Sequence, residues 1–251
     1  MRKIRDWLLT IPFLIAFGLT LLVFDIAGRV VRPFSLRGFE VVMAGLQRTL
    51  MELFRISGTR VEVERSPLLE AKRGYALISN HQSLFDIAVI GGLLPRNYPK
   101  YVAKKELGRW IPSISLNLRK GGNALVDRKD RIGSMRAITT MARIAQDRDV
   151  SVVIFPEGTR SRDGEMLGFK PAGTRALLAA ADQLAVVPVA IDGSWRLLLH
   201  NLLPVPFGTK IRVRFGDPIK RAKGDAEAVA VVAEAWIRDT LAGWRAQPAE
   251  A

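Results

Sequence analysis

The chain has 251 residues, with 38 Lys and Arg against 24 Asp and Glu and no cysteine. Its length is enough to bury a large core, its 49% apolar content excludes disorder, and the missing cysteines exclude disulfides, thiolate metal sites and a cysteine nucleophile. The formal net charge of +14 indicates an anionic partner, such as nucleic acid, anionic lipid, or an acidic protein or substrate.

The first feature along the chain is an uncharged run of 18 residues at positions 7–24. As a helix it would be about 27 Å long, close to the ~30 Å hydrocarbon core of a bilayer. A second, amphipathic helix is expected over residues 39–56, with Pro33 and Gly38 in the connection. We therefore expect residues 1–60 to form a hydrophobic hairpin that dips into or spans a membrane. A soluble hairpin packed on its own domain is the alternative.

The rest of the chain alternates short apolar runs with helical patterns. Strands are expected at residues 75–79, 101–103, 124–126, 151–155, 186–191 and 210–215. Helices are expected at residues 86–94, 131–146, 172–183 and 225–244. This alternation predicts one α/β domain over residues 61–245, with a largely parallel or mixed sheet flanked by helices, and then a frayed tail at 246–251.

Polar residues follow the strand expected at 75–79, at a strand end where open α/β sheets place their ligands. His81 and Asp86 are five positions apart, so they would not share a face of a regular helix but can meet on a turn. An imidazole oriented by a carboxylate can remove a proton from an alcohol. A structural histidine bonded to a carboxylate has the same pattern, so the pair alone does not decide.

A second polar turn follows the strand expected at 151–155. Arg160 and Arg162 can grip a phosphate with their planar guanidinium groups, and Gly158 lets backbone N–H groups approach an anion. Glu157 can orient an arginine or accept a hydrogen bond from a polar head group. A solvated connection is the other interpretation, although most of its charge would then lie directly after a buried strand.

These two turns and their surroundings, over about residues 75–191, resemble the glycerolipid acyltransferases, most closely the 1-acyl-sn-glycerol-3-phosphate acyltransferases. Asn80-His81, four residues and Asp86 look like the family's HX4D motif. The other blocks that carry the resemblance are Lys105-Glu106-Leu107 with Pro112, Gly122 and Asp127-Arg128, then Phe155-Pro156-Glu157-Gly158-Thr159-Arg160-Ser161, and Val187-Pro188-Val189. Residues 124–126, before Asp127, are smaller than is usual in the family, which concerns packing more than chemistry.

The resemblance implies transfer of a fatty acyl group from a thioester to the sn-2 hydroxyl of a lysophosphatidic acid, giving phosphatidic acid. His81 would be the general base, and Asp86 would hold its tautomer. The resemblance assigns the phosphate to Lys105, Arg160 and Arg162, and substrate binding or orientation to Glu157, Gly158 and Thr159. It implies acyl carrier protein or coenzyme A thioester as co-substrate, no other cofactor, and no metal.

Two segments hold most of the excess positive charge. Residues 96–131 contain ten Lys or Arg against three Asp or Glu, a net of +7, and residues 196–223 contain seven against one, a net of +6. A basic face of this kind suits acidic acyl donors and anionic lipid. We therefore expect the protein at the cytoplasmic membrane, anchored by its hairpin, with the active site on the cytoplasmic side.

Three alternatives remain open from the sequence. Nucleic acid would also suit the charge, but there is no recognisable nucleic-acid motif, aromatic residues are only 8%, and the apolar run has no place in a soluble binder. The acceptor could instead be glycerol 3-phosphate or a lyso-aminolipid, since one base serves any hydroxyl. A non-enzymatic membrane lipid-binding protein is the third, and the intact His81 and Asp86 argue against it.

Overall fold

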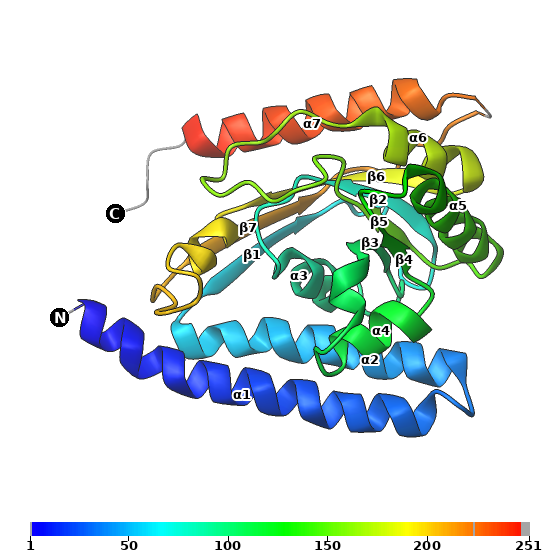
Figure 1. Cartoon of the computed structure of the whole chain (residues 1–251). Helices are drawn as coiled ribbons and strands as arrows, with labels where there is room; N and C mark the ends of the chain where they lie inside the picture. The colour runs from blue at the N-terminus through cyan, green and yellow to red at the C-terminus, as the bar shows by residue number, and fades with distance from the viewer. Residues whose placement is uncertain (1, 223, 247–251) are drawn as a thin grey trace.

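In the computed structural model, which describes residues 2–222 and 224–246, seven strands form one mixed sheet in the order β1-β7-β6-β2-β5-β3-β4 (Figure 1). The strands are β1 (Arg60–Arg65), β2 (Tyr75–Ser79), β3 (Lys100–Lys104), β4 (Ala124–Val126), β5 (Val152–Ile154), β6 (Ala185–Asp192) and β7 (Lys210–Phe215). The five strands from β6 to β4 are parallel, whereas β7 is antiparallel to β6 and parallel to β1. The predicted α/β class and mixed sheet are therefore confirmed.

Helices cover both faces of this sheet (Figure 1). The α-helices are α1 (Arg2–Val31), α2 (Leu36–Glu52), α3 (Asp86–Leu93), α4 (Ile114–Lys120), α5 (Arg131–Asp147), α6 (Pro171–Ala180) and α7 (Ala226–Ala246). Short 3-10 helices are η1 (Leu53–Ser57), η2 (Lys105–Gly108) and η3 (Ser194–Leu198). The expected tail begins at the last residue of α7, and its remaining positions, 247–251, lie outside the described residues.

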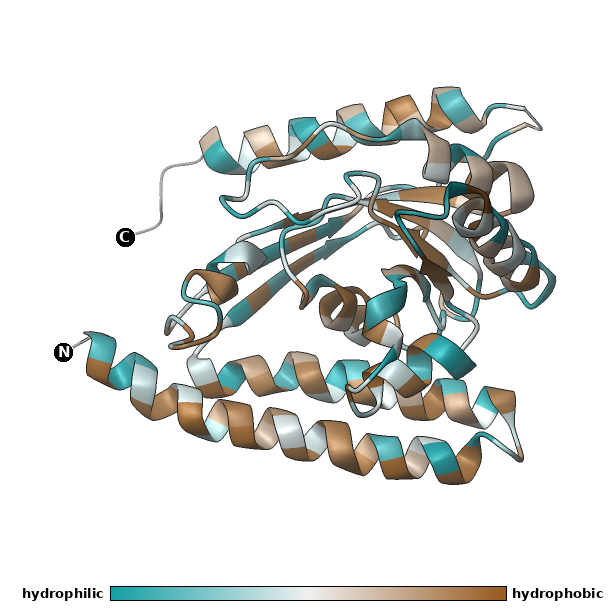
Figure 2. Ribbon diagram, in the orientation of Figure 1, coloured by the Kyte–Doolittle hydropathy of each residue, from teal (hydrophilic) through white to brown (hydrophobic). Residues whose placement is uncertain are grey.

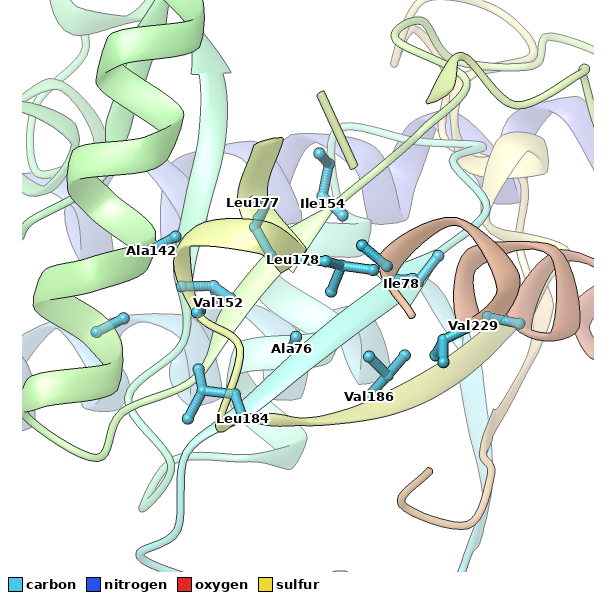
Figure 3. Packing of buried hydrophobic residues seen from close by; sticks show 14 of the residues in the cluster. Ala76, Ile78, Ala142, Val152, Ile154, Leu177, Leu178, Leu184, Val186 and Val229 are labelled. Atoms are coloured by element: carbon cyan, nitrogen blue, oxygen red, sulfur yellow. The ribbon is translucent and has the colours of Figure 1, made fainter. Parts of the chain in front are cut away.

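The core forms on both faces because side chains alternate along the central strands. On one face, Ala76 and Ile78 of β2 pack with Val152 and Ile154 of β5 under α5, α6 and α7 (Figure 3). On the other face, Leu77 of β2 packs against residues of α3, β5 and β6. Both faces of β2 are buried, which explains its continuous apolar sequence.

All six expected strands are present, but the sequence analysis did not predict β1 or α4. Strand β1 alternates charged and apolar residues over positions 60–64 and ends with Arg65, and its acidic side chains pair with β7. Glu62 Oε1 lies 2.8 Å from Lys210 Nζ, and Glu64 Oε2 lies 2.5 Å from an Arg214 guanidinium nitrogen. The β7 part of the basic segment 196–223 is therefore partly neutralised by a strand that the sequence analysis missed.

The amino-terminal hairpin is present, and its first helix is longer than the uncharged run. Within the described residues, one segment, Lys3–Val31, is long and apolar enough to cross a membrane, and only 17% of its most apolar stretch is buried. Apolar residues line the solvent side of α1 (Figure 2). Gly38 was wrongly placed in the connection, because it lies in the first turn of α2 and its N–H donates to the capping Ser35 Oγ.

The hairpin also packs on the sheet domain. Phe13 of α1 and Phe54 of η1 are buried with Phe85, and the rings of Phe54 and Phe85 meet edge to face with centroids 5.2 Å apart. Helix α2 contacts α3 and buries one face, so its amphipathic pattern reflects packing on the domain. The hairpin therefore shares a core with the sheet while α1 keeps an exposed apolar side.

A buried ion cluster fixes α2 to the sheet. Glu40 of α2 accepts hydrogen bonds from Lys100 of β3 at 2.5 Å and from both terminal nitrogens of Arg148 at 2.8 Å. Burial alone would raise the pKa of Glu40, but the hydrogen bonds and positive charges of Arg148 and Lys100 outweigh it and lower that pKa. The carboxylate is thus held ionised between two cations.

Glu40→Gln removes the negative charge and leaves Lys100 buried beside Arg148 without its counterion. Breaking a buried pair in this way costs about 3–5 kcal/mol, so we expect a clear loss of stability in detergent-solubilised protein, measured by thermal or denaturant unfolding. Glu52→Gln is the matched control on the same helix, because Glu52 forms only an exposed pair with Arg55 at 3.0 Å. Equal stability of the two variants would contradict this role for the cluster.

Candidate active site

The carboxyl ends of the parallel strands bring the candidate residues to one edge of the sheet. His81 follows β2, Glu157 follows β5, Lys105 follows β3 and Asp127 follows β4, while Asp192 ends β6. Open α/β sheets bind ligands at this edge. The sheet order therefore gathers at one edge polar turns that are up to about a hundred residues apart in sequence.

Asp86 is completely buried at the start of α3, and both of its oxygens are engaged. Oδ2 lies 2.9 Å from His81 Nδ1 and accepts the backbone N–H groups of Gln82 at 2.8 Å and Ser83 at 2.9 Å. Oδ1 accepts the hydroxyl of Ser194 at 2.6 Å. A buried carboxylate with this many donors is held in one orientation.

The imidazole of His81 is held from three sides. Its Nδ1 faces Asp86, its ring stacks on Phe155 with centroids 4.1 Å apart, and its backbone bonds to the β5 turn. An ionised carboxylate only accepts hydrogen bonds, so a neutral imidazole in this position carries its proton on Nδ1 and keeps a lone pair on Nε2. The His81 side chain is 16% exposed. This places the imidazole, held through Nδ1, at a surface that a ligand can reach.

Glu157 joins the two polar turns. Its Oε1 accepts the backbone N–H of His81 at 2.7 Å, and its Oε2 accepts that of Leu167 at 2.9 Å. A return bond runs from Ser161 N–H to the His81 carbonyl at 2.8 Å. Burial raises the pKa of Glu157, although the two backbone donors oppose this. Both oxygens are thus bonded to protein, and the carboxylate ties the β5 turn to His81.

The block around Lys105 is linked to the same turn. Lys105 Nζ lies 2.7 Å from Asp127 Oδ2, and this ion pair raises the pKa of Lys105. Arg128, which follows Asp127 in the chain, donates from its guanidinium to the carbonyl of Gly158 at 2.8 Å. Gly158 has φ of 67°, a conformation that favours glycine. The contacts therefore bring the second and third sequence blocks together beside His81, and Arg128 is a cation that the predicted site did not include.

Arg160 and Arg162 lie in this turn on either side of Ser161, whose N–H is bonded to His81. Both arginines and Thr159 are exposed. No hydrogen bond or ion pair joins the two guanidinium groups to any other residue that the structure describes. They are therefore cations near His81 that remain available to an anionic ligand.

Several contacts of the site had no signal in the sequence. Ser194 reaches Asp86 from η3, 108 positions further along the chain. Asn80 makes two hydrogen bonds with the backbone of Ile191, each 2.8 Å long, and so extends the contact between β2 and β6. Gln82 donates to Gly164 O and to Asp192 Oδ1, both at 3.1 Å. Tertiary pairing of β2 with its neighbours β5 and β6 brings these groups together.

Comparison with known proteins identifies the family of this chain. Residues 60–192 match the sequence model of the family described as Acyltransferase, which spans more than half of the chain. The chain therefore belongs to the acyltransferase family. Curated relatives include the human 1-acyl-sn-glycerol-3-phosphate acyltransferase alpha, 37% identical over 163 residues, which are 63% of this chain and 55% of that one.

Two further 1-acyl-sn-glycerol-3-phosphate acyltransferases are similar. That of Cocos nucifera is 31% identical over 180 residues, 70% of this chain and 55% of that one, and that of Escherichia coli is 29% identical over 152 residues, 59% and 60% respectively. The chain thus spans a little over half the length of these relatives. The crystal structure of the 1-acyl-sn-glycerophosphate acyltransferase PlsC from Thermotoga maritima covers all of both chains with a TM-score of 0.81 at 24% identity, which shows the same fold.

Glu157→Gln tests the bond between the two turns. A glutamine retains one acceptor oxygen but presents its NH₂ group to a backbone N–H, which leaves a buried donor unsatisfied and costs about 1–3 kcal/mol. We expect lower thermal stability and faster trypsin cleavage at the exposed Arg160 and Arg162. Glu234→Gln on α7, where Glu234 pairs with Arg238 in an exposed i,i+4 pair, is the control. Unchanged cleavage in the Glu157 variant would contradict its anchoring role.

Proposed function

We propose that this protein transfers a fatty acyl group from an acyl thioester to the sn-2 hydroxyl of 1-acyl-sn-glycerol 3-phosphate, with His81 as general base. The observation that carries the proposal is the hydrogen bond between His81 Nδ1 and the buried Asp86, which leaves Nε2 free beside a cluster of cations. Membership of the acyltransferase family and the names of the relatives support this substrate class.

The proposed reaction uses a single displacement. Nε2 of His81 takes the proton of the acceptor hydroxyl as its oxygen attacks the thioester carbonyl, and the tetrahedral adduct then collapses by breaking the carbon–sulfur bond. The thiolate takes the proton back from the imidazolium, so the products are the ester and a free thiol. Asp86 does not change protonation and stabilises the charged imidazole.

The acceptor phosphate would lie against the cations of the neighbouring turns. The guanidinium groups of Arg160 and Arg162 pair with no other described residue, and they suit the oxygens of a phosphomonoester. Lys105 adds positive charge next to the end of β3, although its ion pair with Asp127 offsets part of that charge. Thr159 and Gly158 would offer a hydroxyl and backbone groups to the head group. For Glu157 we propose a positioning role, because its oxygens are already bonded.

The proposed location is the membrane surface. The exposed apolar side of α1 would anchor the protein in the membrane. The active site would lie on the cytoplasmic side of that membrane, where acyl carrier protein and coenzyme A are dissolved. These thioesters are anionic, and the basic segment 96–131 provides complementary charge. The proposal requires no metal and no cofactor beyond the thioester.

The assay that tests the function combines two donors with three acceptors. Purified protein in phospholipid vesicles is given acyl carrier protein or coenzyme A thioesters with lysophosphatidic acid, glycerol 3-phosphate or a lyso-aminolipid, and products are identified by mass spectrometry. We expect phosphatidic acid from lysophosphatidic acid. Thiol release only with another acceptor would show that the acceptor is not lysophosphatidic acid. Lipid binding without thiol release from any donor–acceptor pair would show that the protein binds lipid and is not an acyltransferase.

His81→Ala removes the proposed base. General-base catalysis contributes about 10²–10⁴-fold to such reactions, so we expect a loss of this size in kcat with an unchanged circular dichroism spectrum. His200→Ala is the matched control, because His200 is the other histidine and is exposed after η3. Near-normal turnover by His81→Ala would overturn the mechanism.

Arg160→Ala removes one proposed phosphate ligand. A charge-assisted hydrogen bond contributes about 1.5–3 kcal/mol, so the KM for lysophosphatidic acid should rise at least tenfold while the KM for the thioester changes little. Exposed Arg238 of α7, replaced by alanine, provides a control of equal charge change. Equal increases in both KM values would exclude a specific phosphate contact for Arg160.

A further inference from the structure

The segment between η2 and α4 presents a tryptophan to solvent. Trp110 is 94% exposed, more than any other large apolar side chain of the described residues, and Leu107 in the same segment is 40% exposed. One exposed apolar side chain is ordinary on a protein surface. Trp110 differs from such a residue because its backbone is strained, its loop is anchored, and its neighbours are cationic.

The backbone of this segment adopts an unfavourable conformation twice within four residues. Trp110 has φ of 70° and Ser113 has φ of 57°. Side chains with a Cβ rarely occupy this region, and such strain persists only where surrounding contacts impose it. Neither position is a glycine, which would relieve the strain. The sequence therefore retains a bulky aromatic residue at a turn that disfavours it.

Hydrogen bonds hold the segment on both sides of Trp110. Ser115 Oγ donates to Leu107 O at 2.9 Å and accepts the N–H of Ile111 at 3.0 Å, which closes the turn. Ser113 donates its N–H to Asp25 Oδ1 at 2.8 Å and its hydroxyl to Leu21 O. Both acceptors lie on α1, so the segment is fixed to the hairpin next to α4 (Figure 1).

The same segment carries exposed cations. Lys104 and Arg109 are exposed, and neither side chain has an ion pair or hydrogen bond with another described residue. The nearby part of α1 exposes Leu22, Val23 and Ile26, each more than half accessible. A segment that carries an exposed tryptophan and these two cations and is bonded to an apolar helix has the composition of a membrane interface, where tryptophan lies at headgroup level and cations contact lipid phosphates.

We propose that residues 104–110 form a second membrane contact, separate from the hairpin, in which Trp110 inserts at the headgroup level of an anionic bilayer and Lys104 and Arg109 contact lipid phosphates. The contact continues the exposed apolar side of α1. Lys105 lies in the same segment, so the depth of Trp110 would set the height of Lys105 relative to the membrane phosphates. The segment would thus fix the orientation of the domain on the membrane, which one helix alone leaves free to rotate.

Fluorescence quenching by brominated lipid tests the position of Trp110. The full chain is bound to vesicles of phosphatidylglycerol and phosphatidylcholine with bromine near the headgroup end of the acyl chain. Wild-type protein is compared with Trp110→Phe and with the control Trp236→Phe, whose residue lies on α7 across the sheet (Figure 1). The difference in emission between wild type and Trp110→Phe is the emission of Trp110, and we expect the brominated lipid to quench it strongly. The corresponding difference for Trp236→Phe is the emission of Trp236, and we expect it to be unquenched. Unquenched Trp110 emission would overturn the proposal.

Vesicle sedimentation tests the cations. The pair of substitutions Lys104→Ala and Arg109→Ala should lower partitioning onto phosphatidylglycerol-containing vesicles by roughly fivefold per charge, with little change on pure phosphatidylcholine. Lys129→Ala with Arg131→Ala, two exposed bases after β4, is the matched control for net charge. If both pairs of substitutions lowered partitioning equally, the effect would come from net charge alone, which would contradict a local contact. Neither readout needs acyl transfer, so failure here is distinct from failure of the proposed function.

Discussion

The carboxylate of Asp86 is the constraint on which the site depends. It is buried with four hydrogen-bond donors, contributed by His81, Gln82, Ser83 and Ser194. Burying this charge without such donors would cost far more free energy than any one of these hydrogen bonds contributes. The turn after β2 and the start of η3 must therefore converge on one point, and His81 is oriented as a result.

The sheet order explains why this convergence is stable. Strand β2 lies between β5 and β6, so groups from both neighbours reach residues 80–86. From the β5 side, Glu157 accepts the His81 N–H and Ser161 donates to its carbonyl. From the β6 side, Asn80 bonds to Ile191 on the strand itself. The backbone that carries the imidazole is thus held from both sides, which leaves little reorganisation for the reaction to require.

The sequence predicted the features that depend on local pattern and missed those that depend on tertiary pairing. Strands buried on both faces have continuous apolar runs, so β2 and β6 were readily predicted. Strand β1 was missed because its charged residues are typical of a solvated loop. Only the folded structure shows that Glu62 and Glu64 pair with the bases of β7. Likewise, the local motif pointed to His81 and Asp86, whereas nothing near Ser194 in sequence indicated its bond to Asp86.

The tautomer of His81 is the most direct test, and nitrogen NMR on ¹⁵N-histidine-labelled protein measures it. The chain has two histidines, so His200→Gln leaves one signal to assign. The account predicts that His81 is protonated at Nδ1 and unprotonated at Nε2 in the neutral form, and that Asp86→Asn abolishes this preference. A His81 signal with the proton on Nε2 in the wild-type protein would contradict the account, because that nitrogen could not then act as the base.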